Sequence, residues 1–232
     1  FNYTVTATGP CVEPTAGGTI EVTEDATISL SSAAGTATQT LCINTALTAI
    51  TYSIGGSGTG ATVTGLPAGL TGTYSSGVFT ISGSPTESGT FNYTVTATGP
   101  CVEPTAGGTI TVTPDATITL TSANNNQTRC INTAIANITY SIGGSGMGAT
   151  VTGLPAGVTG TYSSGVFTIS GNPTESGTFN YTVTATGPCV EPTATGTLQV
   201  IALPETAASN NGPVCVGEPL NLTGEPAGMA SY

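Results

Sequence analysis

The stretch FNYTVTATGPCVEPTAGGTI at residues 1–20 occurs three times in this chain. It returns unchanged at residues 91–110 and, with two substitutions, at residues 179–198. The copies begin 90 and 88 residues apart. A near-identical repeat of this length predicts tandem domains rather than a solenoid of short units. Because the first copy opens the sequence, we expect residue 1 to lie inside a domain, in a segment of a longer chain.

Hydrophobic and polar residues alternate along this stretch and along most other apolar segments of the repeat. Tyr93, Val95 and Ala97 fall on one side of their segment, and ITYSI at 50–54 alternates in the same way. Period-two alternation, β-branched residues and turn signals about every 8–12 residues are typical of β-sandwiches. The sequence therefore predicts an all-β fold of antiparallel sandwiches with about seven strands each.

The repeat also predicts where the domains begin and end. We expect a truncated repeat at 1–24, whole repeats at 25–113 and 114–201, and the start of a different sandwich at 202–232. The junction TPD at 113–115 is too short for free swivelling. Successive domains are therefore expected to stack end to end as a semi-rigid rod.

The charge composition excludes several function classes. Only 6% of the residues are charged, the formal net charge is −11, and Arg129 is the sole basic residue. Binding to nucleic acid, or to an anionic membrane surface, needs several Lys or Arg contacts. Histidine and lysine are absent, which removes the usual general base and Schiff-base chemistry. We expect no catalytic residue, no cofactor and no direct membrane insertion.

Acidic side chains are the first candidates for a site. Asp25 and Asp115 stand at the domain junctions, where a calcium ion could bind, but that ion needs six to eight oxygen ligands. Solvated linker acids are the favoured interpretation. A pair of carboxylates about 5–9.5 Å apart would suit glycoside hydrolysis. The pairs Glu87 with Glu103 and Glu175 with Glu191 could be read so, although exposed turn acids are favoured.

Two tyrosines are the candidates for a surface contact. Tyr74 and Tyr162 occupy the same place, GTYSSG, in successive repeats. Each ring could stack on a sugar or on a neighbouring chain. The alternative, which we favour, is a ring that half covers the edge of its own sheet.

The run GLPAGLTGTYSSGVFTISGSPTESGTFNYTVTATG at 65–99 resembles the immunoglobulin-like repeats of bacterial surface proteins. With CIN, TA and GTITVTPDATITL, it is similar to repeats of giant Bacteroidota cell-surface adhesins, including the SprB-like gliding adhesins exported by the type IX secretion system. The resemblance covers nearly all of residues 1–201, and PVCVGEPLNLTGEPAGMASY resembles a second immunoglobulin-like module. It implies tandem immunoglobulin-like sandwiches with a stalk or adhesive function, and it supplies no catalytic residues.

The six cysteines recur at fixed places in the repeat. With no histidine and no CxxC motif, a zinc site is disfavoured, and disulfides in an extracellular, cell-surface protein are expected. One scheme joins Cys11 to Cys42 and Cys101 to Cys130, across domain boundaries.

The scheme we favour joins Cys42 to Cys101 and Cys130 to Cys189, each inside one domain. In an immunoglobulin-like sandwich, the loops after the second and sixth strands lie at the same pole, where both cysteines are expected. Cys11 and Cys215 are then half-pairs whose partners lie outside this sequence.

These observations favour a structural and adhesive cell-surface protein, a stalk of immunoglobulin-like domains supporting attachment or gliding. Neighbouring repeats of the same chain are the expected partners, with surface glycans or other surface proteins beyond them. The alternative is an array of weak carbohydrate-binding modules that gains affinity through avidity.

Overall fold

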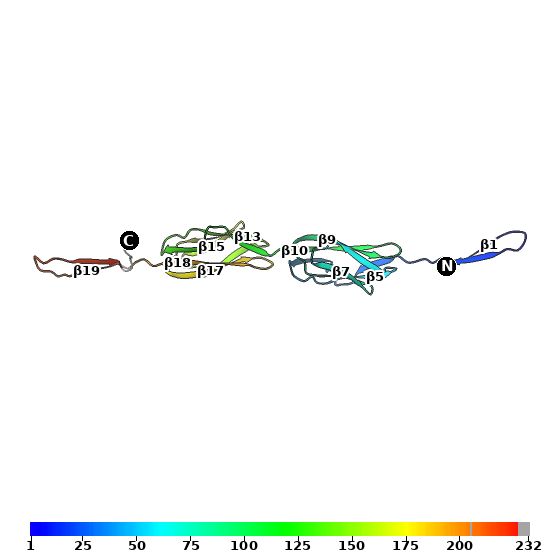
Figure 1. Cartoon of the computed structure of the whole chain (residues 1–232), viewed down its shortest axis with the longest axis horizontal. Helices are drawn as coiled ribbons and strands as arrows, with labels where there is room; N and C mark the ends of the chain where they lie inside the picture. The colour runs from blue at the N-terminus through cyan, green and yellow to red at the C-terminus, as the bar shows by residue number, and fades with distance from the viewer. Residues whose placement is uncertain (205, 227–232) are drawn as a thin grey trace. The chain divides into compact units, whose positions relative to one another are not determined.

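The computed structural model describes residues 1–204 and 206–226. The chain divides into two compact units, Phe1–Pro114 and Asp115–Tyr232, each described by itself (Figure 1). Every regular element of the described residues is a β-strand, and none of them forms a helix long and apolar enough to cross a membrane. The all-β prediction is confirmed.

The first unit contains a sandwich of two four-stranded sheets, with strand orders β3-β5-β8-β7 and β4-β10-β9-β6. Neighbouring strands are antiparallel except β4, which runs parallel to β10. The sandwich has eight strands where the sequence predicted about seven. Their bounds are β3 Ala26–Leu30, β4 Thr38–Cys42, β5 Ile50–Gly56, β6 Gly60–Thr64, β7 Leu70–Ser75, β8 Val78–Gly83, β9 Gly89–Thr98 and β10 Thr105–Thr113.

The second unit repeats this sandwich, with sheets β11-β13-β16-β15 and β12-β18-β17-β14. Strand β12 again runs parallel to its partner, β18. The strands are β11 Ala116–Leu120, β12 Asn126–Cys130, β13 Ile138–Gly144, β14 Gly148–Thr152, β15 Val158–Ser163, β16 Val166–Gly171, β17 Gly177–Thr186 and β18 Thr193–Ile201. The connection before β12 is two residues shorter than the one before β4, at the place where the two sequences differ in length.

The core of each sandwich forms from the predicted alternation. In β5, Ile50, Tyr52 and Ile54 are buried while the residues between them are not. Tyr93 and Val95 of β9 face the same core, and the second unit repeats the pattern. At about 25 cal/mol per Å² of apolar surface, burial of these side chains is the main stabilising term.

Two further hairpins lie outside the sandwiches. Strands β1 (Asn2–Thr6) and β2 (Thr15–Thr19) pair as β9 and β10 do, with Tyr3 opposite Gly18. Tyr3 is 49% exposed, whereas Tyr93, at the same place in the repeat, is 2% exposed. Strands β19 (Thr206–Asn210) and β20 (Leu222–Pro226) form the other hairpin. The predicted fragment 202–232 includes residues 205 and 227–232, which lie outside the described residues.

Strand direction gives each sandwich two distinct ends. In the first unit, the leading end contains Asp25, where Val102 N of the β9–β10 loop donates to Asp25 Oδ1 (3.3 Å). The trailing end contains Thr113, the last residue of β10. Strand β9 has ten residues and runs between these ends. At about 3.4 Å per residue, the ends are roughly 30 Å apart.

Candidate functional site

The predicted disulfides Cys42–Cys101 and Cys130–Cys189 do not form, because the two cysteines of each pair lie at opposite ends of a sandwich. Cys42 pairs in register with Thr113 at the trailing end. Cys101 lies at the leading end, where its Sγ donates to Thr23 O (3.6 Å). The nine residues of β10 separate these levels. A disulfide needs Cα atoms within about 7 Å, so neither sandwich can close this bridge.

The disulfide prediction was wrong because it rested on the wrong direction for one strand, β4. The prediction placed Cys42 at the pole shared with Cys101. Strand β4 instead runs parallel to β10, which carries its last residue to the other pole. Cys130 lies opposite Ile201 in the same way, so the correction applies to both repeats.

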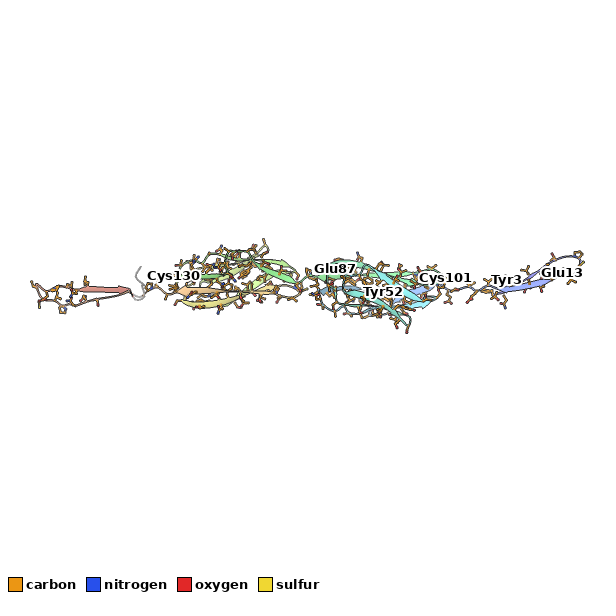
Figure 2. The ribbon with its side chains drawn as sticks, viewed as in Figure 1. Tyr3, Glu13, Tyr52, Glu87, Cys101 and Cys130 are labelled. Carbon is orange, nitrogen blue, oxygen red and sulfur yellow. The ribbon has the colours of Figure 1, made fainter. Side chains whose placement is uncertain are left out.

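Cys42 and Cys189 are each disulfide-bonded. Cys11, Cys101, Cys130 and Cys215 are exposed free thiols, two of which Figure 2 labels. Cys42 and Cys189 are half-buried, unlike their equivalents Cys130 and Cys101. Because Cys11, Cys101 and Cys130 are free, neither scheme that the sequence suggested is formed.

The carboxylates of the two junction aspartates bind the β9–β10 and β17–β18 loops at the leading end of each sandwich. Asp25 Oδ1 accepts from Val102 N, and Asp115 Oδ1 accepts from Val190 N at 3.4 Å. Glu103 Oε1 and Glu191 Oε1 accept from Gly99 N and Gly187 N of the same loops at 3.4 and 3.1 Å. Within residues 1–204 and 206–226, no group of three or more acidic or cysteine side chains gathers as metal ligands would.

The other two candidate acids, Glu87 and Glu175, accept hydrogen bonds from loops at the trailing end of each sandwich. Glu87 Oε1 accepts from Ala68 N, and Glu175 Oε1 accepts from Ala156 N, each at 2.9 Å. Glu87 therefore lies at the opposite end of the sandwich from Glu103, with the length of β9 between them. Figure 2 shows Glu87 and Cys101 at these two ends. The carboxylates proposed as a glycosidase pair do not converge.

Tyr74 and Tyr162 are half-buried, and their rings pack against the core of their own sandwich. The favoured interpretation, a ring that covers its own sheet, describes these contacts. A face of each ring for a sugar or a neighbouring chain stays a prediction.

A buried tyrosine pair was missed by the sequence analysis. Tyr52 Oη and Tyr93 Oη lie 2.9 Å apart in the core, and Tyr93 donates to Ala37 O (3.2 Å). Because the single proton of Tyr93 goes to that carbonyl, Tyr52 must donate to Tyr93. Burial raises the pKa of Tyr93 well above its ordinary value of 10.0.

The second unit repeats the pair with Tyr140 and Tyr181, whose hydroxyl oxygens lie 3.2 Å apart. Tyr181 donates to Asn125 O at 2.7 Å, and burial raises its pKa in the same way. A glycine makes room for the hydroxyl in each case. A Cβ on Gly108 would overlap Tyr93 Oη and the carbonyl of Ala37, and a Cβ on Gly196 would overlap Tyr181 Oη and the carbonyl of Asn125. The only sequence signal was a tyrosine and a glycine at matched places in every copy.

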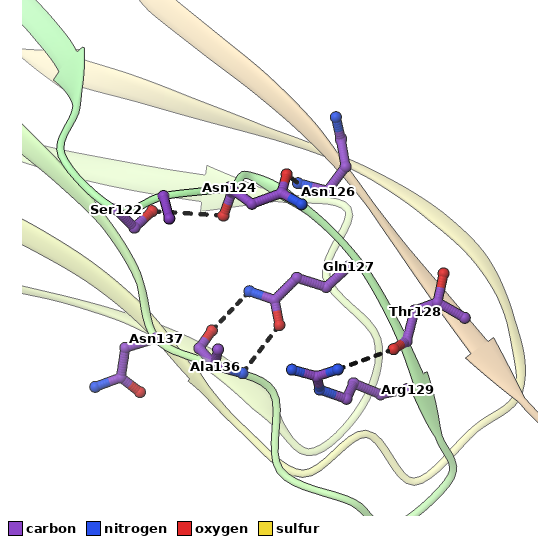
Figure 3. Close-up of a pocket in the computed structure, with 9 residues that line it drawn as sticks. Ser122, Asn124, Asn126, Gln127, Thr128, Arg129, Ala136 and Asn137 are labelled. Carbon is purple, nitrogen blue, oxygen red and sulfur yellow. Dashed lines mark hydrogen bonds between the residues drawn. The ribbon is translucent and has the colours of Figure 1, made fainter.

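A polar depression of about 450 Å³ lies on the second unit, and it too was missed (Figure 3). Gln127 spans it by donating to Ala136 O (2.8 Å) and accepting from Ala136 N (2.9 Å). Arg129, the sole basic residue, lies at its edge and donates to Thr128 O. The first unit has Leu41 in place of Arg129. The depression is lined by Ser122, Ala123, Asn124, Asn126, Gln127, Thr128, Arg129, Ala136 and Asn137.

Comparisons with known proteins give the fold and no family. No protein-family model matches the sequence, and no curated protein matches it. The I-band fragment I67-I69 from titin is similar in structure, with a TM-score of 0.55 and 10% identity over 89% of this chain and 77% of that one. The fold is that of tandem immunoglobulin-like domains. An E-to-A variant of the same titin fragment gives a TM-score of 0.56 at 11% identity, with the same coverage.

The immunoglobulin-like fold confirms that part of the sequence prediction. The two described sandwiches, β3 to β10 and β11 to β18, are its repeating units. At such low identity, the likeness concerns the fold alone.

Proposed function

We propose that this chain is a load-bearing and adhesive stalk segment of an extracellular bacterial surface protein, in which immunoglobulin-like repeats hold a binding region away from the cell. In this proposal the chain performs no catalysis and needs no cofactor. The fold agrees with a structural stalk, and the sequence resemblance to gliding adhesins supports surface attachment.

One observation carries the stalk proposal. Only Pro114 and Asp115 lie between β10 of one sandwich and β11 of the next. Proline fixes its own φ, and Asp115 is held by Val190 N (3.4 Å). A connection of two restrained residues leaves little freedom for swivelling, which is what a stiff spacer requires.

Small-angle X-ray scattering of the full chain tests the stalk. A compact chain of this length would have a radius of gyration of about 17 Å. Two sandwiches in a row, each about 40 Å long with its loops, would give about 23 Å or more. The matched control carries a flexible insert of about twelve Gly and Ser residues between Pro114 and Asp115, and its distance distribution should broaden. A value near 17 Å, or an identical distribution with the insert, would refute the stiff stalk.

A second candidate function, weak carbohydrate binding, is favoured by the polar depression beside Arg129. Amide and guanidinium groups there could donate to sugar hydroxyls or to an acidic sugar. A glycan array probed with the full chain tests it. Binding that is lost in Arg129→Ala and kept in Tyr162→Ala would assign it to the depression. The reverse result would assign it to the tyrosine, and no binding to any glycan would remove this candidate.

A further inference from the structure

The polar depression of the second unit lies where the two repeats differ most. Residues 138–187 differ from residues 50–99 at only three positions. Of the nine residues that line the depression, five have no identical residue at the matching place in the first repeat. Asn124 lies in the loop that is two residues shorter, and Asn126, Arg129, Ala136 and Asn137 stand where the first repeat has Thr38, Leu41, Thr48 and Ala49. The differences between the repeats are therefore concentrated around one surface feature.

A glutamine that both repeats share links its strand to the loop that follows. In the first unit, Gln39 Nε2 donates to Thr36 O (2.9 Å) and to Thr48 O (2.8 Å), which uses both of its N–H groups. In the second unit the loop before β12 is shorter, and among the described residues Gln127 Nε2 donates only to Ala136 O (2.8 Å). One N–H of Gln127 is therefore left for a ligand.

The sole basic residue lies on the same side of β12 as this glutamine. Side chains two residues apart on a strand share a face, and Figure 3 shows Gln127 and Arg129 both directed towards the loop at Ala136. Arg129 uses one of its five N–H donors, which donates from Nη1 to Thr128 O (3.2 Å). Within residues 1–204 and 206–226, the guanidinium makes no ion pair. Most of its donors are therefore available to an anion.

Packing does not account for an arginine at this place. Leu41, its counterpart, packs against the core of the first unit. Arg129 instead brings a charge to a half-buried position, which costs stability unless that charge has a partner. An anion bound in the depression would supply the partner.

We propose that the depression binds an oligosaccharide carrying one carboxylate, such as a single uronic or sialic acid on neutral sugars. The proposal rests on the weak carbohydrate binding put forward for this depression. The guanidinium of Arg129 grips the carboxylate through two parallel N–H donors. The free N–H of Gln127 and the Nδ2 of Asn124, whose Oδ1 accepts from Asn126 N (2.8 Å), donate to sugar hydroxyls. The depression, at about 450 Å³, lies within the roughly 300–1,000 Å³ of small-molecule sites.

Charge limits the ligand to one carboxylate. The formal net charge is −11, so a polyanion would gain a single ion pair at Arg129 and be repelled by the rest of the chain. The described residues that line the depression include no acid. Asp115, Glu175 and Glu191 accept hydrogen bonds from the backbone of other loops. The cation therefore faces the depression without a competing carboxylate.

A glycan array of matched pairs, probed with the full chain, tests the ligand class. The pairs are sialyllactose beside lactose, and glucuronoxylotriose beside xylotriose. We expect each acidic glycan to bind about tenfold more tightly than its neutral parent, because hydrogen bonds to charged groups are the stronger ones, and salt to weaken this preference. Equal binding within the pairs would overturn the proposal and leave carbohydrate binding standing. No binding to any glycan would remove both.

Two further probes separate one carboxylate on a sugar from other anions. Sodium acetate, added as a competitor in millimolar excess, should displace the acidic glycans only weakly, because it lacks the sugar hydroxyls. A heparin fragment, which carries many sulfates, should bind no better than a neutral glycan. Complete displacement by acetate, or tight binding of heparin, would contradict the proposed ligand.

The first repeat supplies the matched variant. Arg129→Leu gives the second repeat the residue of the first, which folds as the same sandwich. This variant should lose the preference for acidic glycans and keep its urea unfolding midpoint, while Tyr162→Ala should keep the preference. A preference that survives Arg129→Leu would overturn the assignment to this depression.

The reciprocal change moves the site into the first repeat. Residues 31–49 are replaced by 121–137 of the second repeat, which include every residue that lines the depression. NMR titration of this chain with sialyllactose should shift backbone signals in both repeats, whereas in the unchanged chain it should shift those of the second repeat alone. Shifts confined to the second repeat in the altered chain would show that these residues do not form the site, contrary to the proposal.

Discussion

Removing the hydroxyl of one tyrosine in each buried pair should cost more stability than removing the other. Tyr93→Phe leaves the hydroxyl of Tyr52 without an acceptor in a core where Tyr52 is 1% exposed. Ala37 O still accepts from Thr109 N (3.0 Å), so the loss falls mainly on Tyr52. An unsatisfied buried hydroxyl costs about 1–3 kcal/mol. We expect Tyr93→Phe to lower the free energy of unfolding by about 2 kcal/mol.

Tyr52→Phe should cost less, because Tyr93 keeps its bond to Ala37 and loses only an accepted one. A single hydrogen bond contributes about 1 kcal/mol. In the double variant no hydroxyl of the pair is left unsatisfied, so we expect a cost of about 1.5 kcal/mol, well below the sum. The difference of about 1.5 kcal/mol is within the range found for residues in direct contact.

Urea unfolding followed by circular dichroism measures these values. The changes are made in both repeats together, with Tyr140 matching Tyr52 and Tyr181 matching Tyr93, so that neither unit masks the other. Tyr74→Phe is the control, since among the described residues its hydroxyl makes no hydrogen bond. The reasoning fails if Tyr52→Phe costs as much as Tyr93→Phe, or if the two costs simply add.

Three further predictions concern the pH dependence of stability, the hydrogen bond of Glu175 to a loop, and the close packing at Gly108. The pKa of Tyr93 is raised above 10.0, so the stability that the protonated hydroxyl contributes is complete below pH 10 and is lost as the pH rises further. In thermal melts at pH 8 and pH 11, Tyr93→Phe should therefore lose less melting temperature at the higher pH than the unchanged chain does. Glu175→Ala should cost about 1 kcal/mol and speed hydrogen exchange at Ala156, whereas Glu175→Gln should retain most of the protection. Gly108→Ala should lower the free energy of unfolding by about 1–3 kcal/mol in urea titrations, against no effect of Gly9→Ala, whose Cβ would meet open space.

Local pattern was enough to predict the strands and the core, because alternation fixes which side chains face inward. Tyr52 and Tyr93 were both assigned to their inner faces from sequence alone. Alternation does not say which strands are neighbours or which way they run. The parallel pairing of β4 with β10 joins residues about 70 positions apart, and no local signal encodes it. That one direction decides the pole of Cys42, and the predicted disulfides failed there.

The roles of the acidic residues were predicted only in part. Glu87 was correctly placed in a turn, and the structure adds that its carboxylate holds Ala68 N of another loop. Sequence cannot show such a contact, because the two loops meet only when the sandwich closes. The polar depression beside Arg129 was also missed, since it forms only where β12 meets the loops that precede and follow it.

The parallel pairing of β4 with β10 also decides how each sandwich would respond to tension. A pull on the last residue of β10 acts along the strand, so the hydrogen bonds between the two strands are loaded in shear. Because the bonds of a parallel pair are evenly spaced, they would share the load rather than open one after another. Strand β12 pairs with β18 in the same way, so the second sandwich would resist a pull on Ile201 by the same means.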